Sequence, residues 1–223
     1  MTEPEEPGPK LSTSTGAGAQ RPQPFSMIRS FVPADLVTMV NAACGMGAIL
    51  AMVRYAQGHD ATFAWLAFAL LPIALVADIL DGAVARATKR QSALGADLDS
   101  LADVVSFGAA PAVVGFTLGL DGGWDAIILV FFVACGISRL ARFNVTAAAL
   151  SEGTGKVKYY EGTPIPTTLG LVVVLVIAFW RGAVHDSLLG GQLALGPFVL
   201  HPLALAFFAS GCAMVSTLRI PKP

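Results

Sequence analysis

Four aspartates stand close together in segments of the sequence that are otherwise apolar: Asp78, Asp81, Asp99 and Asp103. A carboxylate at the centre of a membrane helix costs about 2.5–3.5 kcal/mol on insertion scales, so four of them require a compensating partner. They would repel one another unless protons or cations lay between them. Clustered carboxylates suit Mg²⁺ or Mn²⁺, with substrate phosphates completing the coordination. We therefore predict a site for two divalent ions.

The spacing of these aspartates favours one common site. Asp78 and Asp81 are three residues apart and Asp99 and Asp103 are four apart, so each pair lies along one face of a helix. Two neighbouring helices joined by a short basic loop would bring the pairs together. The elements that must position them are therefore two successive helices, whose facing sides carry the carboxylates.

The residues between the aspartates complete the pattern D-x2-D-G-x2-A-R-x8-G-x3-D-x3-D. Gly82 and Gly95 remove side chains where the two helices would otherwise block a ligand. Taken alone, Gly82 is also compatible with simple helix packing. Arg86 can neutralise a phosphate or anchor its helix at the lipid headgroups. A chance match of the whole pattern is very improbable.

The composition places these helices in a bilayer. Of the 223 residues, 55% are hydrophobic and 13% are charged, against about 25% charged in an average globular chain. The mean hydropathy is +0.68. These values exclude an ordinary soluble domain, and we expect membrane lipids and no nucleic acid as partners. The length suits about six spans of ~20 residues.

Six apolar runs predict an all-α integral membrane bundle. We place the spans at 33–55, 61–86, 97–120, 125–147, 164–182 and 198–218. Residues 1–24, rich in Pro, Gly, Ser, Thr and Glu, are predicted to be a disordered cytoplasmic tail. Residues 25–223 then form the membrane domain, which begins with a short amphipathic helix or a flexible lead-in.

The positions of Lys and Arg predict the orientation. With six spans, twelve of the 14 Lys and Arg residues fall on the side that holds both termini, and two fall on the other side. Basic residues collect on the cytoplasmic side of membrane proteins. Both termini and the aspartates should therefore be cytoplasmic. The scattered cysteines and histidines show no metal-ligand spacing, and we assign them no chemistry.

The aspartate pattern resembles the signature of the CDP-alcohol phosphotransferase family of integral membrane enzymes. The resemblance implies a six-helix membrane domain, a homodimer, and transfer of a phosphatidyl or similar group from a CDP-linked donor. It also implies that Asp78, Asp81 and Asp99 hold the first metal ion. Asp78, Asp99 and Asp103 would hold the second, and Asp103 would be the general base.

The same resemblance implies contacts to the CDP-diacylglycerol donor. The residues concerned are Asp35, Thr38, Gly82, Arg86, Ser92 and Gly95. Asp35 and Thr38 lie at the start of the first span and look like the family's further nucleotide contacts. The other four belong to the aspartate pattern or to the loop within it.

Three further stretches resemble the phosphatidylserine synthase branch of the family, in its fungal-type form. They are the run from Asp99 to Pro111, the run Ser138-Arg-Leu-Ala-Arg-Phe-Asn144, and the run Tyr159 to Thr168 together with the terminal Ile220-Pro-Lys-Pro223. In that branch Arg142 and Phe143 look like residues of the serine site. The expected acceptor is therefore L-serine.

The charges near the fourth span agree with an amino-acid acceptor. Arg139 and Arg142 are three residues apart near its cytoplasmic end, and a guanidinium can bind a carboxylate through two hydrogen bonds. Anchoring at the membrane surface is the alternative role for this pair. Glu161 is a candidate for the serine ammonium, or else a solvated loop residue.

The sequence thus predicts a CDP-diacylglycerol–serine transferase reaction that releases CMP. One alternative keeps the chemistry and changes the acceptor to glycerol 3-phosphate or inositol. A remote alternative is an ion or proton transporter that relays through membrane aspartates. The membrane would be the endoplasmic reticulum for a fungal protein and the plasma membrane for a prokaryotic one.

Overall fold

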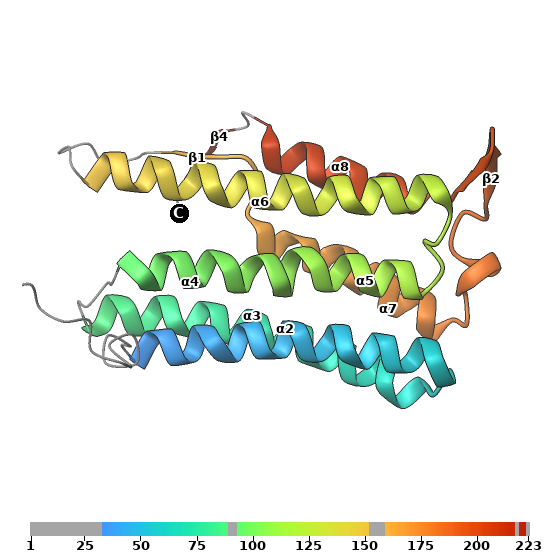
Figure 1. Ribbon diagram of the computed structural model, residues 1–223, viewed down its shortest axis with the longest axis horizontal. Helices are drawn as coiled ribbons and strands as arrows, with labels where there is room; N and C mark the ends of the chain where they lie inside the picture. The colour runs from blue at the N-terminus through green and yellow to red at the C-terminus, as the bar shows by residue number, and fades with distance from the viewer. Residues whose placement is uncertain (1–32, 89–92, 152–158, 217–218, 222–223) are drawn as a thin grey trace, which may run out of the picture. The chain divides into compact units, whose positions relative to one another are not determined.

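Apolar helices make up most of the described part of the chain, as the computed structural model shows (Figure 1). The structure describes residues 33–88, 93–151, 159–216 and 219–221. The predicted tail 1–24, the amphipathic lead-in from residue 25 and Ser92 lie outside the described residues. The helices are α2 (Pro33–Gly58), α3 (Ala61–Thr88), α4 (Ala93–Asp103), α5 (Ala110–Thr117), α6 (Gly123–Ser151), α7 (Leu169–Trp180) and α8 (Ala204–Val215).

Four helical segments in this part of the chain are long and apolar enough to cross a membrane. They are Ala34–Gly58, Ala61–Ala87, Gly95–Thr117 and Gly123–Thr146, and two shorter apolar helices cover Ile165–Trp180 and Ala204–Val215. All six coincide with predicted spans. The helical, membrane-embedded fold is therefore confirmed, whereas the count of six complete spans stays a prediction.

The packing of the helices separates an inner surface from a lipid-facing one. α2 packs along α3 and α6 packs along α8, while the α4–α5 segment contacts both α2 and α6 (Figure 1). Small side chains such as Ala48, Ala64 and Ala67 are buried here and allow close approach of helix backbones. Large apolar side chains such as Leu36 and Val130 remain exposed, as a helix surface in hydrocarbon requires.

A π-helical segment, η1 (Val104–Ala109), interrupts the helix between α4 and α5. Here the Ala110 N–H donates to the Val105 carbonyl, five residues back, so the turn is one residue wider than an α-helical turn. An extra residue shifts the helix face by about 100°. The wide turn thus rotates α5 relative to α4. As a result, the aspartates of α4 and the core-facing side chains of α5 do not lie on one continuous helix face.

Two side-chain hydrogen bonds, one to η2 (Ile165–Thr168) and one to α2, hold this wide turn in place. Thr168 Oγ1 donates to the Phe107 carbonyl at 2.7 Å, and Ser106 Oγ donates to the Asn41 carbonyl at 2.9 Å. Gly45 makes the second contact possible, because a Cβ there would lie 2.7 Å from Ser106 Cα. The η1 turn that follows α4 is therefore anchored directly to α2.

Short strands complete the described fold and alter one predicted boundary. β1 (Tyr159–Glu161) pairs antiparallel with β4 (Arg219–Pro221), and β2 (Leu193–Leu195) pairs antiparallel with β3 (Phe198–Leu200). The sixth helix begins at Ala204 and not at 198, because residues 198–200 form β3.

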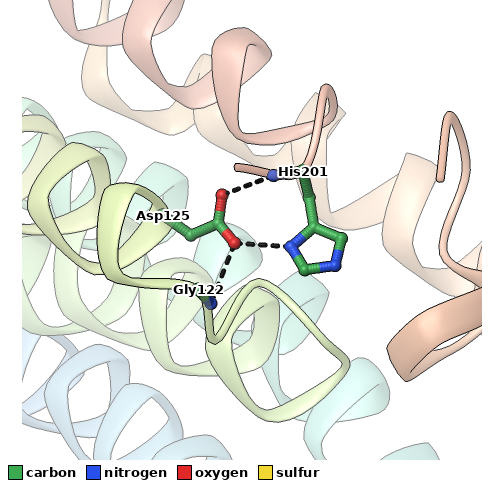
Figure 2. A network of polar contacts seen from close by, with 3 residues as sticks. All are labelled: Gly122, Asp125 and His201. Carbon is green, nitrogen blue, oxygen red and sulfur yellow. Dashed lines mark hydrogen bonds and ion pairs between the residues drawn. The ribbon is translucent and has the colours of Figure 1, made fainter. Parts of the chain in front are cut away.

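Two carboxylates order the chain at the ends of helices remote from the aspartate cluster. Asp60 Oδ1 accepts a hydrogen bond from the Thr62 N–H at 2.9 Å at the start of α3. That bond lowers the pKa of Asp60 below its usual value. In the first turn of α6, the fully buried Asp125 accepts from the backbone N–H groups of Gly122 and His201 (Figure 2).

The His201 ring completes this second contact. Its Nδ1 lies 2.5 Å from Asp125 Oδ2 (Figure 2), and Nδ1 must be the donor because a carboxylate only accepts. Asp125 thereby joins the start of α6 to the segment that leads into α8. We name Gly122, Asp125 and His201 the α6–α8 clasp.

We expect Asp125→Ala to lower the free energy of unfolding by about 2–4 kcal/mol, since it leaves buried donors without an acceptor. Thermal unfolding of the purified protein in detergent measures this as a lower melting temperature. Asp121→Ala is the matched control, because Asp121 is exposed just before the start of α6. Equal melting temperatures for the two variants would show that the clasp does not stabilise the fold.

Candidate metal and nucleotide site

The structure brings three of the four predicted aspartates into one cluster. Asp78 comes from α3, and Asp99 and Asp103 come from α4. One carboxylate oxygen from each lies within 4.8 Å of the other two. Asp103 is buried and the other two are half-buried. Three oxygens at this spacing could hold a metal ion.

The charges of the cluster require a cation or protons. Two full negative charges 4.8 Å apart, the largest separation in the cluster, repel by about 3.5 kcal/mol at an effective dielectric constant of about 20. In addition, Asp99 Oδ1 is buried without a hydrogen-bond partner among the described residues. Buried polar atoms normally have a partner. A divalent ion would supply one, and it would offset the repulsion.

Asp81 lies beside the cluster and is held by α2. Thr38 Oγ1 donates to Asp81 Oδ2 at 2.7 Å, and both side chains are buried. Asp81 is not part of the three-oxygen group. The three clustered residues are those of the predicted second metal set, Asp78, Asp99 and Asp103. Both metal sets, including the first set with Asp81, stay predictions.

A second side chain of α2 reaches the cluster. Asn41 Nδ2 donates to Asp103 Oδ1 at 3.4 Å, and Asn41 is fully buried. Sequence analysis missed this residue. The available signal was its position three residues after Thr38, since a polar side chain on the same face of a membrane helix is rare and usually functional.

Most of the predicted nucleotide contacts lie around Asp81. Asp35 is buried on the same face of α2 as Thr38. Gly82 directly follows Asp81, and a Cβ at Gly82 would lie 3.3 Å from an Nη atom of Arg86, which is exposed. Gly95 is half-buried near the start of α4.

The predicted serine residues lie on α6 and β1. Arg142 Nη2 donates to the Val215 carbonyl at the end of α8, at 3.2 Å. Phe143 is exposed and Arg139 is half-buried on α6. Glu161 lies in β1, in register with Arg219 of β4. Their role in binding serine stays a prediction.

The contacts of Asn144 explain why the Arg142 side chain points toward α8. Ser100 Oγ donates to Asn144 Oδ1 at 3.1 Å, and Asn144 Nδ2 donates to Asp97 Oδ1 at 3.5 Å. Asn144 therefore faces α4. A residue two positions away is turned by about 200° around the helix, so Arg142 points toward α8. These bonds connect α6 to the helix that carries Asp99 and Asp103.

Comparison with known proteins identifies the class. The profile of the CDP-alcohol phosphatidyltransferase family matches residues 31–209, which include α2 to α7 and the first half of α8. The chain belongs to this family. Membership confirms the resemblance of the aspartate pattern to this family. It also favours a transferase over an ion or proton transporter.

Individual relatives show which members of the family the chain is similar to. The chain is 43% identical over 203 residues to the CDP-diacylglycerol–serine O-phosphatidyltransferase of Saccharomyces cerevisiae, covering 89% of this chain and 74% of the relative. The enzyme of the same name from Methanocaldococcus jannaschii is 36% identical, with coverage of 89% and 78%. The archaetidylserine synthase of Methanothermobacter thermautotrophicus is 34% identical, with coverage of 87% and 72%.

We expect Thr38→Val to weaken metal binding, because Asp81 loses the hydrogen bond that orients it. Loss of such an outer contact typically costs about 10–100-fold in metal affinity or activity. A titration with Mg²⁺ or Mn²⁺ measures the concentration that gives half-maximal activity. The control is Thr117→Val, since Thr117 donates only to Val113 of its own helix. A similar response in both variants would contradict a role for Thr38 at the site.

Proposed function

We propose that this chain is an integral membrane enzyme that transfers the phosphatidyl group of CDP-diacylglycerol to the hydroxyl of L-serine and releases CMP. The observation that carries the proposal is the cluster of Asp78, Asp99 and Asp103 in membrane helices. The names of the yeast and archaeal relatives support serine as the acceptor.

The proposed cofactor is a pair of divalent ions, Mg²⁺ or Mn²⁺. Asp78, Asp81 and Asp99 would hold one ion, and Asp78, Asp99 and Asp103 the other. When bound, such ions neutralise the phosphates of the donor and stabilise the departing CMP. The buried Asp99 Oδ1, which has no described hydrogen-bond partner, supports a ligand role for that residue.

Asp103 is the proposed general base. Its carboxylate accepts the proton of the serine hydroxyl while the hydroxyl oxygen attacks the phosphorus that carries the diacylglycerol. A new oxygen–phosphorus bond forms, and the bond from that phosphorus to the CMP oxygen breaks. Asn41 supports this role, because its hydrogen bond to Asp103 Oδ1 fixes the orientation of the carboxylate.

The donor is proposed to lie with its acyl chains in lipid and its nucleotide against α2 and α3. Its proposed contacts are Asp35, Thr38, Gly82, Arg86, Ser92 and Gly95. The absence of a side chain at Gly82 leaves space beside Asp81 for the pyrophosphate. Arg86, exposed next to that space, can pair with a phosphate oxygen.

The carboxylate of serine is proposed to bind Arg142, with Phe143, Arg139 and Glu161 as further contacts. Arg142 uses one nitrogen for the Val215 carbonyl. A guanidinium has five N–H donors, so others remain for a substrate. In this arrangement the serine site extends from the aspartates toward α6 and α8.

The basic residues support a cytoplasmic location for both termini and for the aspartates, since twelve of the 14 lie on that side of the predicted topology. The enzyme would act as a homodimer, as its family resemblance implies. Its membrane would be the endoplasmic reticulum in a fungus and the plasma membrane in a prokaryote.

An acceptor comparison tests the proposed reaction. Purified protein receives labelled CDP-diacylglycerol, Mg²⁺ or Mn²⁺, and one of L-serine, glycerol 3-phosphate or inositol. We expect phosphatidylserine and CMP as products with serine, and little product with the other two. Faster transfer to glycerol 3-phosphate or inositol would overturn the assignment of the acceptor.

We expect Asp103→Asn to lower turnover by about 10²- to 10⁴-fold, the usual contribution of a positioned base. Binding of CDP-diacylglycerol should persist, because the remaining aspartates still hold the donor. Release of CMP measures turnover, and equilibrium binding of the labelled donor measures retention. Asp121→Asn, in an exposed loop, is the control. Normal turnover in Asp103→Asn would remove this residue from the mechanism.

A further inference from the structure

Only one of the two polar groups of the Asn41 side chain has a hydrogen-bond partner among the described residues. Asn41 is fully buried in α2, and its Nδ2 donates to Asp103 Oδ1 at 3.4 Å. Its Oδ1 is buried and has no hydrogen-bond partner among the described residues. Burial of an amide oxygen without a hydrogen-bond partner costs free energy. We therefore expect a bound ligand to donate a hydrogen bond to Asn41 Oδ1.

The orientation of the amide is set by its surroundings. A carboxylate only accepts hydrogen bonds, so the NH₂ group of Asn41 must face Asp103 and the oxygen must face elsewhere. The backbone of Asn41 is fixed as well, because Ser106 Oγ donates to its carbonyl and Gly45 allows η1 to lie against α2. Asn41 Oδ1 is therefore held in a fixed position beside Asp103, where it can accept a hydrogen bond.

The missing donor must come from outside the cluster, since the aspartates can only accept when they are ionised. The proposed substrate carries such a donor. In serine, the α-ammonium is two carbons from the hydroxyl oxygen. In Asn41, Oδ1 and the Nδ2 that touches Asp103 are bonded to the same carbon. When the serine hydroxyl lies on Asp103, its ammonium is within reach of Oδ1.

We propose that Asn41 Oδ1 accepts a hydrogen bond from the α-ammonium of the serine substrate, which makes Asn41 a residue that determines acceptor specificity. This inference rests on the proposed function. The Nδ2 of the same side chain orients the base, so one residue couples recognition of the amine to activation of the hydroxyl. An ammonium has three N–H donors, so a contact to Glu161 is compatible with this arrangement.

The test compares serine with 3-hydroxypropionate, which lacks only the amine. For Asn41→Leu in the full-length protein, we expect the KM for serine to rise about 10–100-fold, the usual value of a hydrogen bond to a charged group. The inhibition constant of 3-hydroxypropionate and the KM for CDP-diacylglycerol should change by no more than about threefold. A lower kcat is also expected, because Asp103 loses its hydrogen bond.

Ser106→Ala is the matched control, because it removes the bond to the Asn41 backbone and leaves the amide intact. It should preserve the ratio of the serine KM to the 3-hydroxypropionate inhibition constant. Asn41→Ser, whose hydroxyl is too short to reach the ammonium, gives the same test with a smaller change in the core. Thermal unfolding with and without CDP-diacylglycerol shows that each variant is folded.

Three results would overturn the inference. Equal weakening of serine and 3-hydroxypropionate would show a purely structural role. The same loss of selectivity in Ser106→Ala would assign the effect to packing. A higher metal requirement with an unchanged serine KM would make Oδ1 a metal ligand. Failure of wild-type protein to use serine would instead overturn the proposed function, so the two failures are distinguishable.

Discussion

Mutual repulsion among the carboxylates of Asp78, Asp99 and Asp103, whose oxygens lie within 4.8 Å of one another, is the interaction on which the rest of the structure depends. Inside apolar helices this repulsion is weakly screened. Left alone, it would push α3 and α4 apart. The helices must therefore be held by other contacts and by whatever cation the cluster binds. This repulsion opposes folding, and a bound cation would relieve it.

The first membrane helix supplies the holding contacts. One face of α2 carries Thr38 and Asn41, which donate hydrogen bonds to Asp81 and Asp103 respectively. Another face carries exposed apolar residues such as Leu36, which suit contact with lipid. Gly45 then allows the wide turn of η1 to lie directly against this helix. Each of these donors uses only part of the accepting capacity of its carboxylate, so α2 can orient Asp81 and Asp103 and still leave lone pairs available for a cation.

The part of the site that could be predicted from the sequence is the part governed by helical periodicity. The spacing of Asp78, Asp99 and Asp103 was sufficient to expect a cluster, and the apolar runs located the helices. Contacts between segments far apart in the sequence leave no pattern of residue spacing from which they could be predicted. Asn41 meets Asp103 across 62 residues, and the π-helical turn depends on Thr168, 61 residues from Phe107. The direction of Arg142 follows from the bonds of Asn144 on the other side of its helix, which the run of basic residues does not reveal.

The α6–α8 clasp has a mechanical consequence. Asp125 and His201 join the two helices at the end where α6 begins, whereas Asn144 lies 19 residues farther along α6, about 30 Å away at 1.5 Å per residue. Near Asn144, α6 is connected to α4 by polar contacts of side chains only partly buried. Because the clasp fixes the beginning of α6, a small rotation of α6 about the clasp would displace Asn144 much more than Asp125. The spacing between α6 and α4 is therefore more sensitive to such a rotation near Asn144 than near the clasp.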